Sequence, residues 1–265
     1  MIHRFKPRAC GLAGVFALLL GAGAAHADAL AQLKQFMDGT RSARGTFSQQ
    51  VFSKSGRKPQ QASGTFAFSR PGKFRWIYEK PYAQLLVGDG SKLWAYDQEL
   101  NQLLVGVGNG SPWNQKYRSA GKCDNLFLAS IVALDPDTGK YKWHFQENPG
   151  ETWDFTATQQ ITLADLTIDG KVRKVAMQAP KNGFFYVIDR TDGRFISAGA
   201  YAPQNWAERI DPVTGRPTEK PGIRYADGPA IVLPSGIGAH AWMPMSYSPK
   251  TGLVYLPTLE AGNII

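Results

Sequence analysis

Cysteine, histidine and long apolar runs are scarce in this chain of 265 residues. It has two cysteines, Cys10 and Cys123, and four histidines. Loss of Cys10 with an N-terminal leader would leave Cys123 alone, so an intramolecular disulfide is excluded from the exported chain. No Cys-x-x-Cys-His motif is present, which excludes a covalently attached c-type haem. The longest apolar run, Leu12–Leu20, is too short to cross a bilayer.

Clustered basic residues are also missing. The net charge is +9, and no run of Lys and Arg is interleaved with aromatic residues. Three of the cations, Arg4, Lys6 and Arg8, lie in the first eight residues, and without them the charge is about +6. A solvated basic surface explains this surplus better than nucleic-acid binding, so no nucleic-acid partner is expected.

The N-terminus has the pattern of a secretory signal peptide. Its cations precede the apolar core Leu12–Leu20, and Ala25-His26-Ala27 is a small-x-small cleavage site before Asp28. We therefore expect residues 1–27 to be a signal peptide, the mature chain to begin at Asp28, and no transmembrane segment to remain after cleavage. The expected location is an exported compartment.

Residues 28–102 predict one helix followed by an antiparallel meander. Apolar residues at 30, 33, 36 and 37 have helical spacing, and Asp38-Gly39 ends the pattern. Alternating runs then predict strands, with a turn at Gly88-Asp89-Gly90. The strands expected from these runs are 45–52, 64–68, 73–78, 84–87 and 93–96. One face is strongly aromatic, with Phe66, Phe68, Phe74, Trp76 and Tyr78. Such a face suits an ordinary core under a helix or, alternatively, an apolar cavity for an acyl chain.

The same region resembles LolA, the periplasmic outer-membrane lipoprotein carrier. The motifs are Ser69-Arg-Pro-Gly-Lys-Phe-Arg-Trp76, Gln84-Leu-Leu-Val87, Asp89-Gly90 and Leu93-Trp-Ala-Tyr-Asp97. The resemblance implies a half-barrel lidded by helices that shelters lipoprotein acyl chains and exchanges them with the inner- and outer-membrane transport machinery. It assigns Arg70 to the lid and Phe74 to the lipid cavity, with Trp76 on the same aromatic face. The family's further strands and lid helices do not follow here, so we expect an unpaired edge.

Residues 103–265 predict part of a β-propeller. Short strands end in Asp-x-x-Thr/Asp-Gly turns, which recur at Asp135–Gly139 and Asp189–Gly193, with a related turn at Ser248–Gly252. A blade takes about 40–50 residues, so this stretch holds about three to four blades, fewer than most closed rings contain. The fold class expected for the whole chain is therefore mainly β, with an N-terminal helix, a partial half-barrel and an incomplete propeller.

Three polar residues in this half can carry chemistry. From the residues alone, Asn109 suits a turn, Asp154 a strand edge and Lys181 an exposed turn. Their amide and carboxylate oxygens would also suit a hard cation such as Ca²⁺. A carboxylate beside an ammonium could take a proton from a hydroxyl group. Both interpretations stay open on this pattern.

The surrounding motifs resemble the methanol and ethanol dehydrogenases that depend on pyrroloquinoline quinone (PQQ). They are Gly106–Trp113, Asp124–Ser130, Ala133–Trp143, Trp153-Asp-Phe155, Ala179–Gly183 and Gly238–Trp242. The resemblance implies oxidation of a primary alcohol to an aldehyde with PQQ, Ca²⁺ and an electron acceptor. It assigns the catalytic base to Asp154, the metal ligands to Asn109 and Asp154, and a quinone contact to Lys181. Ala241 stands where the family often has Asn.

Neither half contains all the elements of the family it resembles, and no Gly/Ser/Pro linker separates them near residues 101–103. Three hypotheses follow. The chain is a hybrid whose larger part is an inactive fragment of a periplasmic PQQ-dependent alcohol dehydrogenase, or a lipoprotein carrier whose second half was replaced, or a recombined or misassembled reading frame without function. Pairing between the open sheet edges of the two halves would be the one route to a compact product.

Overall fold

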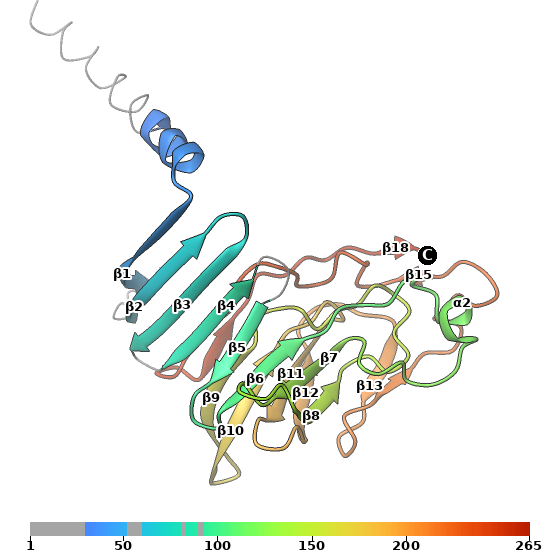
Figure 1. Cartoon of the computed structure of the whole chain (residues 1–265). Helices are drawn as coiled ribbons and strands as arrows, with labels where there is room; N and C mark the ends of the chain where they lie inside the picture. The colour runs from blue at the N-terminus through green and yellow to red at the C-terminus, as the bar shows by residue number, and fades with distance from the viewer. Residues whose placement is uncertain (1–29, 52–59, 81–82, 90–92) are drawn as a thin grey trace, which may run out of the picture.

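The computed structural model describes residues 30–51, 60–80, 83–89 and 93–265. The expected signal peptide and the start of the mature chain lie outside these residues. The first described element is a helix over residues 30–39. It carries the predicted apolar stripe, but Leu30, Leu33, Phe36 and Met37 are exposed, and Figure 1 shows the helix projecting away from the sheet that follows it. None of the helices in the described ranges has the length and hydropathy needed to cross a membrane.

One antiparallel sheet of eight strands runs without interruption through both halves of the chain (Figure 1). Each strand pairs with the next one along the sequence, in the order β1 to β8. The strands are β1 Ser42–Val51, β2 Gln60–Ser69, β3 Lys73–Lys80, β4 Gln84–Asp89, β5 Leu93–Asp97, β6 Gln102–Gly106, β7 Ser130–Leu134 and β8 Tyr141–Gln146.

The predicted unpaired edge at the join is wrong. Strand β5 pairs with β6 through Asp97↔Gln102, Tyr96↔Leu103, Ala95↔Leu104 and Trp94↔Val105. The alternative considered from the sequence, pairing between the edges of the two halves, is the one that the structure adopts. The assignment of 28–102 and 103–265 as separate domains stays a prediction, but hydrogen bonds of a single sheet cross that boundary.

A second sheet packs against the later strands of the first. Its order is β12-β11-β10-β9, again antiparallel neighbours in sequence. Its side chains share one buried core with the first sheet, and the rings of Phe145 and Tyr186 lie 5.7 Å apart. The strands are β9 Thr162–Ile168, β10 Lys171–Gln178, β11 Phe184–Asp189 and β12 Phe195–Ala200.

The rest of the described chain forms short two-stranded sheets and one short helix. The helix, α2 Gln115–Ser119, begins after Asn114, whose side chain accepts a hydrogen bond from the backbone N–H of Lys116. The remaining strands are β13 Ala207–Ile210, β14 Pro217–Glu219, β15 Ile231–Val232, β16 Ser246–Ser248, β17 Leu253–Tyr255 and β18 Asn263–Ile264. The mainly β class is confirmed, whereas the expected number of propeller blades stays a prediction.

Candidate functional site

The segment that carries Asp154 is held by two buried aromatic neighbours. Trp153 and Phe155 are both 0% exposed, and the ring of Trp153 lies 5.2 Å from that of Trp206. With both neighbours buried, the chain presents Asp154 from a left-handed backbone conformation, φ +67°. Residues other than glycine rarely adopt this conformation, and it is frequent at functional sites.

The side chain of Glu151 holds the same loop through hydrogen bonds to its backbone. Its Oε1 accepts hydrogen bonds from the backbone N–H groups of Trp153 and Phe155, at 2.6 and 2.9 Å. Its Oε2 is buried without a hydrogen-bond partner among the described residues. Burial raises the pKa of Glu151 from 4.5 to about 7, against the lowering effect of the two backbone donors. Glu151 is therefore a positioning residue for Asp154 that the sequence patterns did not reveal.

The structure brings Lys181 to Asp154. The Lys181 Nζ lies 3.1 Å from Asp154 Oδ2, 3.1 Å from the Asp154 carbonyl oxygen and 2.7 Å from that of Gly236. Both charged side chains are mostly buried, at 16% and 18% exposure. A Cβ at Gly238, which has φ +93°, would lie 2.4 Å from Lys181 Cγ, so this position requires glycine. The ammonium of Lys181 and the carboxylate of Asp154 therefore form a close, mostly buried ion pair.

Asn109 is not joined to this pair by any hydrogen bond among the described residues. Its side-chain amide donates to the carbonyl of Gly110 at 3.2 Å. The neighbouring backbone is anchored instead: Ala129 N–H donates to the Gly108 carbonyl and Ala157 N–H to that of Val107. Of the three residues predicted from the sequence, the structure therefore brings two into contact.

The hydrogen bonds of this pair leave few free contacts for a cofactor. The ammonium of Lys181 has three N–H donors, and three protein oxygens already accept from it. Calcium takes six to eight oxygen ligands, and the described residues contain no group of three His, Cys, Asp or Glu that could hold a metal ion. With its three hydrogen bonds made inside the protein, the Lys181 ammonium has no N–H donor left for a quinone.

The residues predicted for the lipid cavity lie on the open end of the large sheet. Phe74 is 37% exposed, and the ring of Trp76 lies 4.7 Å from Phe47 and 5.7 Å from Phe66. Arg70 donates to the carbonyl of Met37 and lies over the rings of Phe36 and Phe68. Arg70 therefore ties the end of the helix to the sheet, while the aromatic face stays partly open.

A prediction on pH follows from Glu151. Its folded pKa lies above its unfolded value, so its stabilising contribution is complete below about 4.5 and is lost as the pH rises through about 7. We expect the unfolding free energy to fall by about 3 kcal/mol across this range. Glu151→Gln should remove that part of the slope in urea unfolding at both ends of the range, whereas Glu208→Gln at an exposed position should retain it. An unchanged slope in Glu151→Gln would contradict the prediction.

Comparison with known proteins finds similarity to two families. Residues 38–132 match the outer membrane lipoprotein carrier protein LolA. The chain is 60% identical over 158 residues to the quinohemoprotein alcohol dehydrogenase ADH IIB of Pseudomonas putida, and 58% identical over 151 residues to the quinohemoprotein alcohol dehydrogenase of Comamonas testosteroni. These matches cover 60% and 57% of this chain but 23% and 21% of the relatives, so the chain spans about a fifth of their length.

Solved structures agree with the sequence matches. Quinohemoprotein alcohol dehydrogenase ADHIIG from Pseudomonas putida superposes with a TM-score of 0.63 and 38% identity, over 74% of this chain and 37% of that one. The Comamonas testosteroni enzyme gives 0.61 and 37% identity, over 77% and 40%. Over the matched residues, the fold is similar to that of these quinohemoprotein alcohol dehydrogenases. The chain as a whole is similar to two families, the lipoprotein carriers and the quinohemoprotein alcohol dehydrogenases, as a chimera of both would be.

Proposed function

We propose that this chain is a periplasmic hybrid whose larger part is a fragment of a PQQ- and Ca²⁺-dependent alcohol dehydrogenase, and that it does not oxidise alcohols by itself. The observation that carries the proposal is the Asp154–Lys181 pair on its glycine-lined loop. This pair is the acid–base part of an alcohol site. The reaction class is removal of a hydroxyl proton from a primary alcohol, with Asp154 as the base.

The arrangement of the same residues supports the proposed lack of turnover. All three N–H donors of Lys181 are used within the protein. The side-chain amide of Asn109 donates to the carbonyl of Gly110 in its own loop. Binding a quinone would require at least one of the Lys181 hydrogen bonds to break, and the described residues hold no group of three His, Cys, Asp or Glu that could bind a metal ion. Asp154 and Lys181 are thus retained parts of a site whose cofactor contacts are not assembled.

The test is a dye-reduction assay on the purified chain with PQQ, Ca²⁺ and ethanol. We expect the rate to equal that of Asp154→Asn, and we expect no PQQ-dependent change in absorbance on mixing. A cofactor-dependent rate that Asp154→Asn abolishes would contradict the proposed inactivity and would support the assignment of the base. Substitution of the exposed Asp227 provides the control, since its side chain is 95% exposed and far from Asp154 in sequence.

A lipoprotein carrier is the second candidate, favoured by the partly open aromatic face around Trp76 and by the contact of Arg70 with the helix. An acyl chain would bury part of this apolar surface, at about 25 cal/mol per Å². The same preparation separates the candidates: saturable binding of a fluorescent fatty acid, weakened by Trp76→Ala, would favour the carrier.

A further inference from the structure

The two halves meet in a tight turn between β5 and β6. Asp97 is only 3% exposed, and its Oδ1 accepts hydrogen bonds from the backbone N–H groups of Glu99 and Leu100, at 3.1 and 3.3 Å. Asn101 completes the turn in a left-handed conformation, φ +43°. The join is therefore a closed hairpin turn with the usual side-chain support for such turns, and not a linker.

Strands β5–β8 have the same order as strands β9–β12. Each set contains four antiparallel strands that are consecutive in sequence. In each set, an Asp-x-x-Thr/Asp-Gly turn joins the third strand to the fourth, at Asp135–Gly139 and Asp189–Gly193. By this correspondence β5, from the carrier-like half, occupies the place that β9 has in the other set. It is the first strand of a propeller-type blade.

The buried face of β5 continues that of the dehydrogenase-like strands. Ala95 is paired with Leu104, Leu104 with Ala133, and Ala133 with Trp143. All four side chains are buried and belong to one core cluster. Because residues on a strand alternate between faces, a slip of one residue in β5 would remove Ala95 from this row. The register at the join is thus the one that completes the core.

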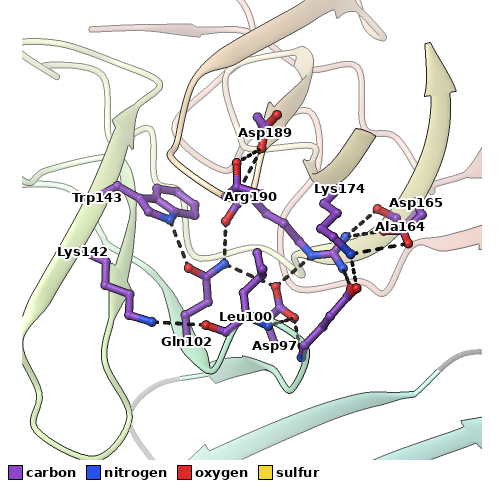
Figure 2. Close-up of polar contacts among 12 residues, drawn as sticks. Asp97, Leu100, Gln102, Lys142, Trp143, Ala164, Asp165, Lys174, Asp189 and Arg190 are labelled. Atoms are coloured by element: carbon purple, nitrogen blue, oxygen red, sulfur yellow. Dashed lines mark hydrogen bonds and ion pairs between the residues drawn. The ribbon is translucent and has the colours of Figure 1, made fainter. Parts of the chain in front are cut away.

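An ion-pair cluster joins β5 to the next blade (Figure 2). Arg190, in the turn after β11, has a side chain that is 6% exposed. Its Nε lies 2.8 Å from Asp97, and its two terminal nitrogens lie 2.7 Å from Glu99 and 2.9 Å from Asp165.

Backbone and amide contacts complete the same cluster. Gln102 donates to the Arg190 carbonyl at 2.6 Å and accepts from Trp143 Nε1 at 3.1 Å. Lys142 donates to the carbonyls of Leu100 and Asn101, as Figure 2 shows for the first of them. Hence two carboxylates from one side of the join and one from the other surround a single buried cation.

The structural similarity to the dehydrogenases also extends to residues before the join. The structural match covers 74% of the chain, whereas the sequence match covers 60%. Residues 103–265 are 163 of the 265 residues, which is less than the 74% that the structural match covers. The fold of the dehydrogenases is therefore followed by residues before 103, where the sequence resembles the carrier.

We propose that β5, together with Asp97 and Glu99, completes a composite blade in cis, so that β5–β12 form one cooperative unit locked by Arg190. The carrier-like segment supplies the first strand of the dehydrogenase-like blade. The other edge of β5 is paired with β4, which leaves it closed to a strand from another chain. This inference concerns assembly of the chain and does not depend on the activity proposed above.

Hydrogen exchange of the full chain, read by mass spectrometry, tests the proposal. Amides of β5 should exchange as slowly as those of β6–β8, within about threefold. Asp97→Ala should raise exchange at least tenfold in both β5–β8 and β9–β12, because it removes a partner of Arg190. Asp227→Ala, at an exposed ion pair, should change neither set.

Two outcomes would overturn the composite blade. The first is exchange of β5 at the rate of an unprotected peptide while β6–β12 stay slow, a result that needs no variant. The second is an effect of Asp97→Ala confined to β5. If Asp97→Ala does not fold, Asp97→Asn keeps the volume and should act in the same direction with a smaller increase in both sets. An increase limited to one set would again contradict the proposal.

Discussion

Replacing Arg190 with methionine is expected to lower the free energy of unfolding by about 3–5 kcal/mol, because Asp97 would remain buried without its cation. The side chains of Arg190 and Asp97 are 6% and 3% exposed, with 2.8 Å between Nε and Oδ2. The loss should appear as a lower urea midpoint with an unchanged slope, since the folded structure and the surface exposed on unfolding stay the same.

Arg194→Met is the matched control, since Arg194 follows in the same turn and its side chain is 84% exposed in a pair with Asp192. We expect less than about 0.5 kcal/mol for this change. Combining Arg190→Met with Asp97→Asn should recover part of the stability, because the second substitution removes the unpaired buried charge. Equal midpoints for Arg190→Met and Arg194→Met would show that the cluster does not hold the two sheets together.

Gly106→Ala should be the most damaging small substitution in β6. A Cβ at this position would lie 1.8 Å from the carbonyl oxygen of Ala157, so the backbone of β6 or of residues 157–158 must move. Overpacking of this kind costs about 3 kcal/mol, and we expect a fall of that size in the free energy of unfolding.

Gly108→Ala, two residues further on, provides the comparison. The nearest atom to its Cβ is Thr158 Cγ2 at 4.0 Å, and we expect a change within about 0.5 kcal/mol. Thermal and urea unfolding of the two variants measure the difference. Similar stability of Gly106→Ala and Gly108→Ala would mean that β6 does not pack against residues 157–158.

Strands were predictable from the sequence where alternation was strong. The runs at 64–68 and 73–78 lie within β2 and β3, and the Asp135–Gly139 turn lies between β7 and β8 as expected. The partner of β5 was not predictable, because a period of two residues determines which side chains share a face but not which strand lies beside them. The pairing with β6 depends on the turn at Asp97 and on the core row through Ala95.

The site was predictable only through family resemblance. Asp154 and Lys181 lie 27 residues apart, and nothing in their local patterns brings an acid at a strand edge to a lysine in a turn. Arg190 was missed for a similar reason. It lies in an Asp-x-x-Asp-Gly turn that suggests an exposed residue, yet Asp97, 93 residues away, and Asp165 bury and neutralise it. Glu151 belongs to no sequence motif. It is recognised in the structure because its carboxyl group is buried and only one of its two oxygens accepts hydrogen bonds among the described residues.

The neighbour-to-neighbour order of the eight-stranded sheet also determines how the chain can reach its folded state. Every strand from β1 to β8 pairs with the one made just before it. Pairing between neighbours in sequence keeps the contact order of the sheet low, although the connection from β6 to β7 runs from 107 to 129. A chain emerging from synthesis can add β6 to β5 without waiting for distant segments. Strands that resemble two different families, joined at a hairpin, are therefore expected to form together as one meander.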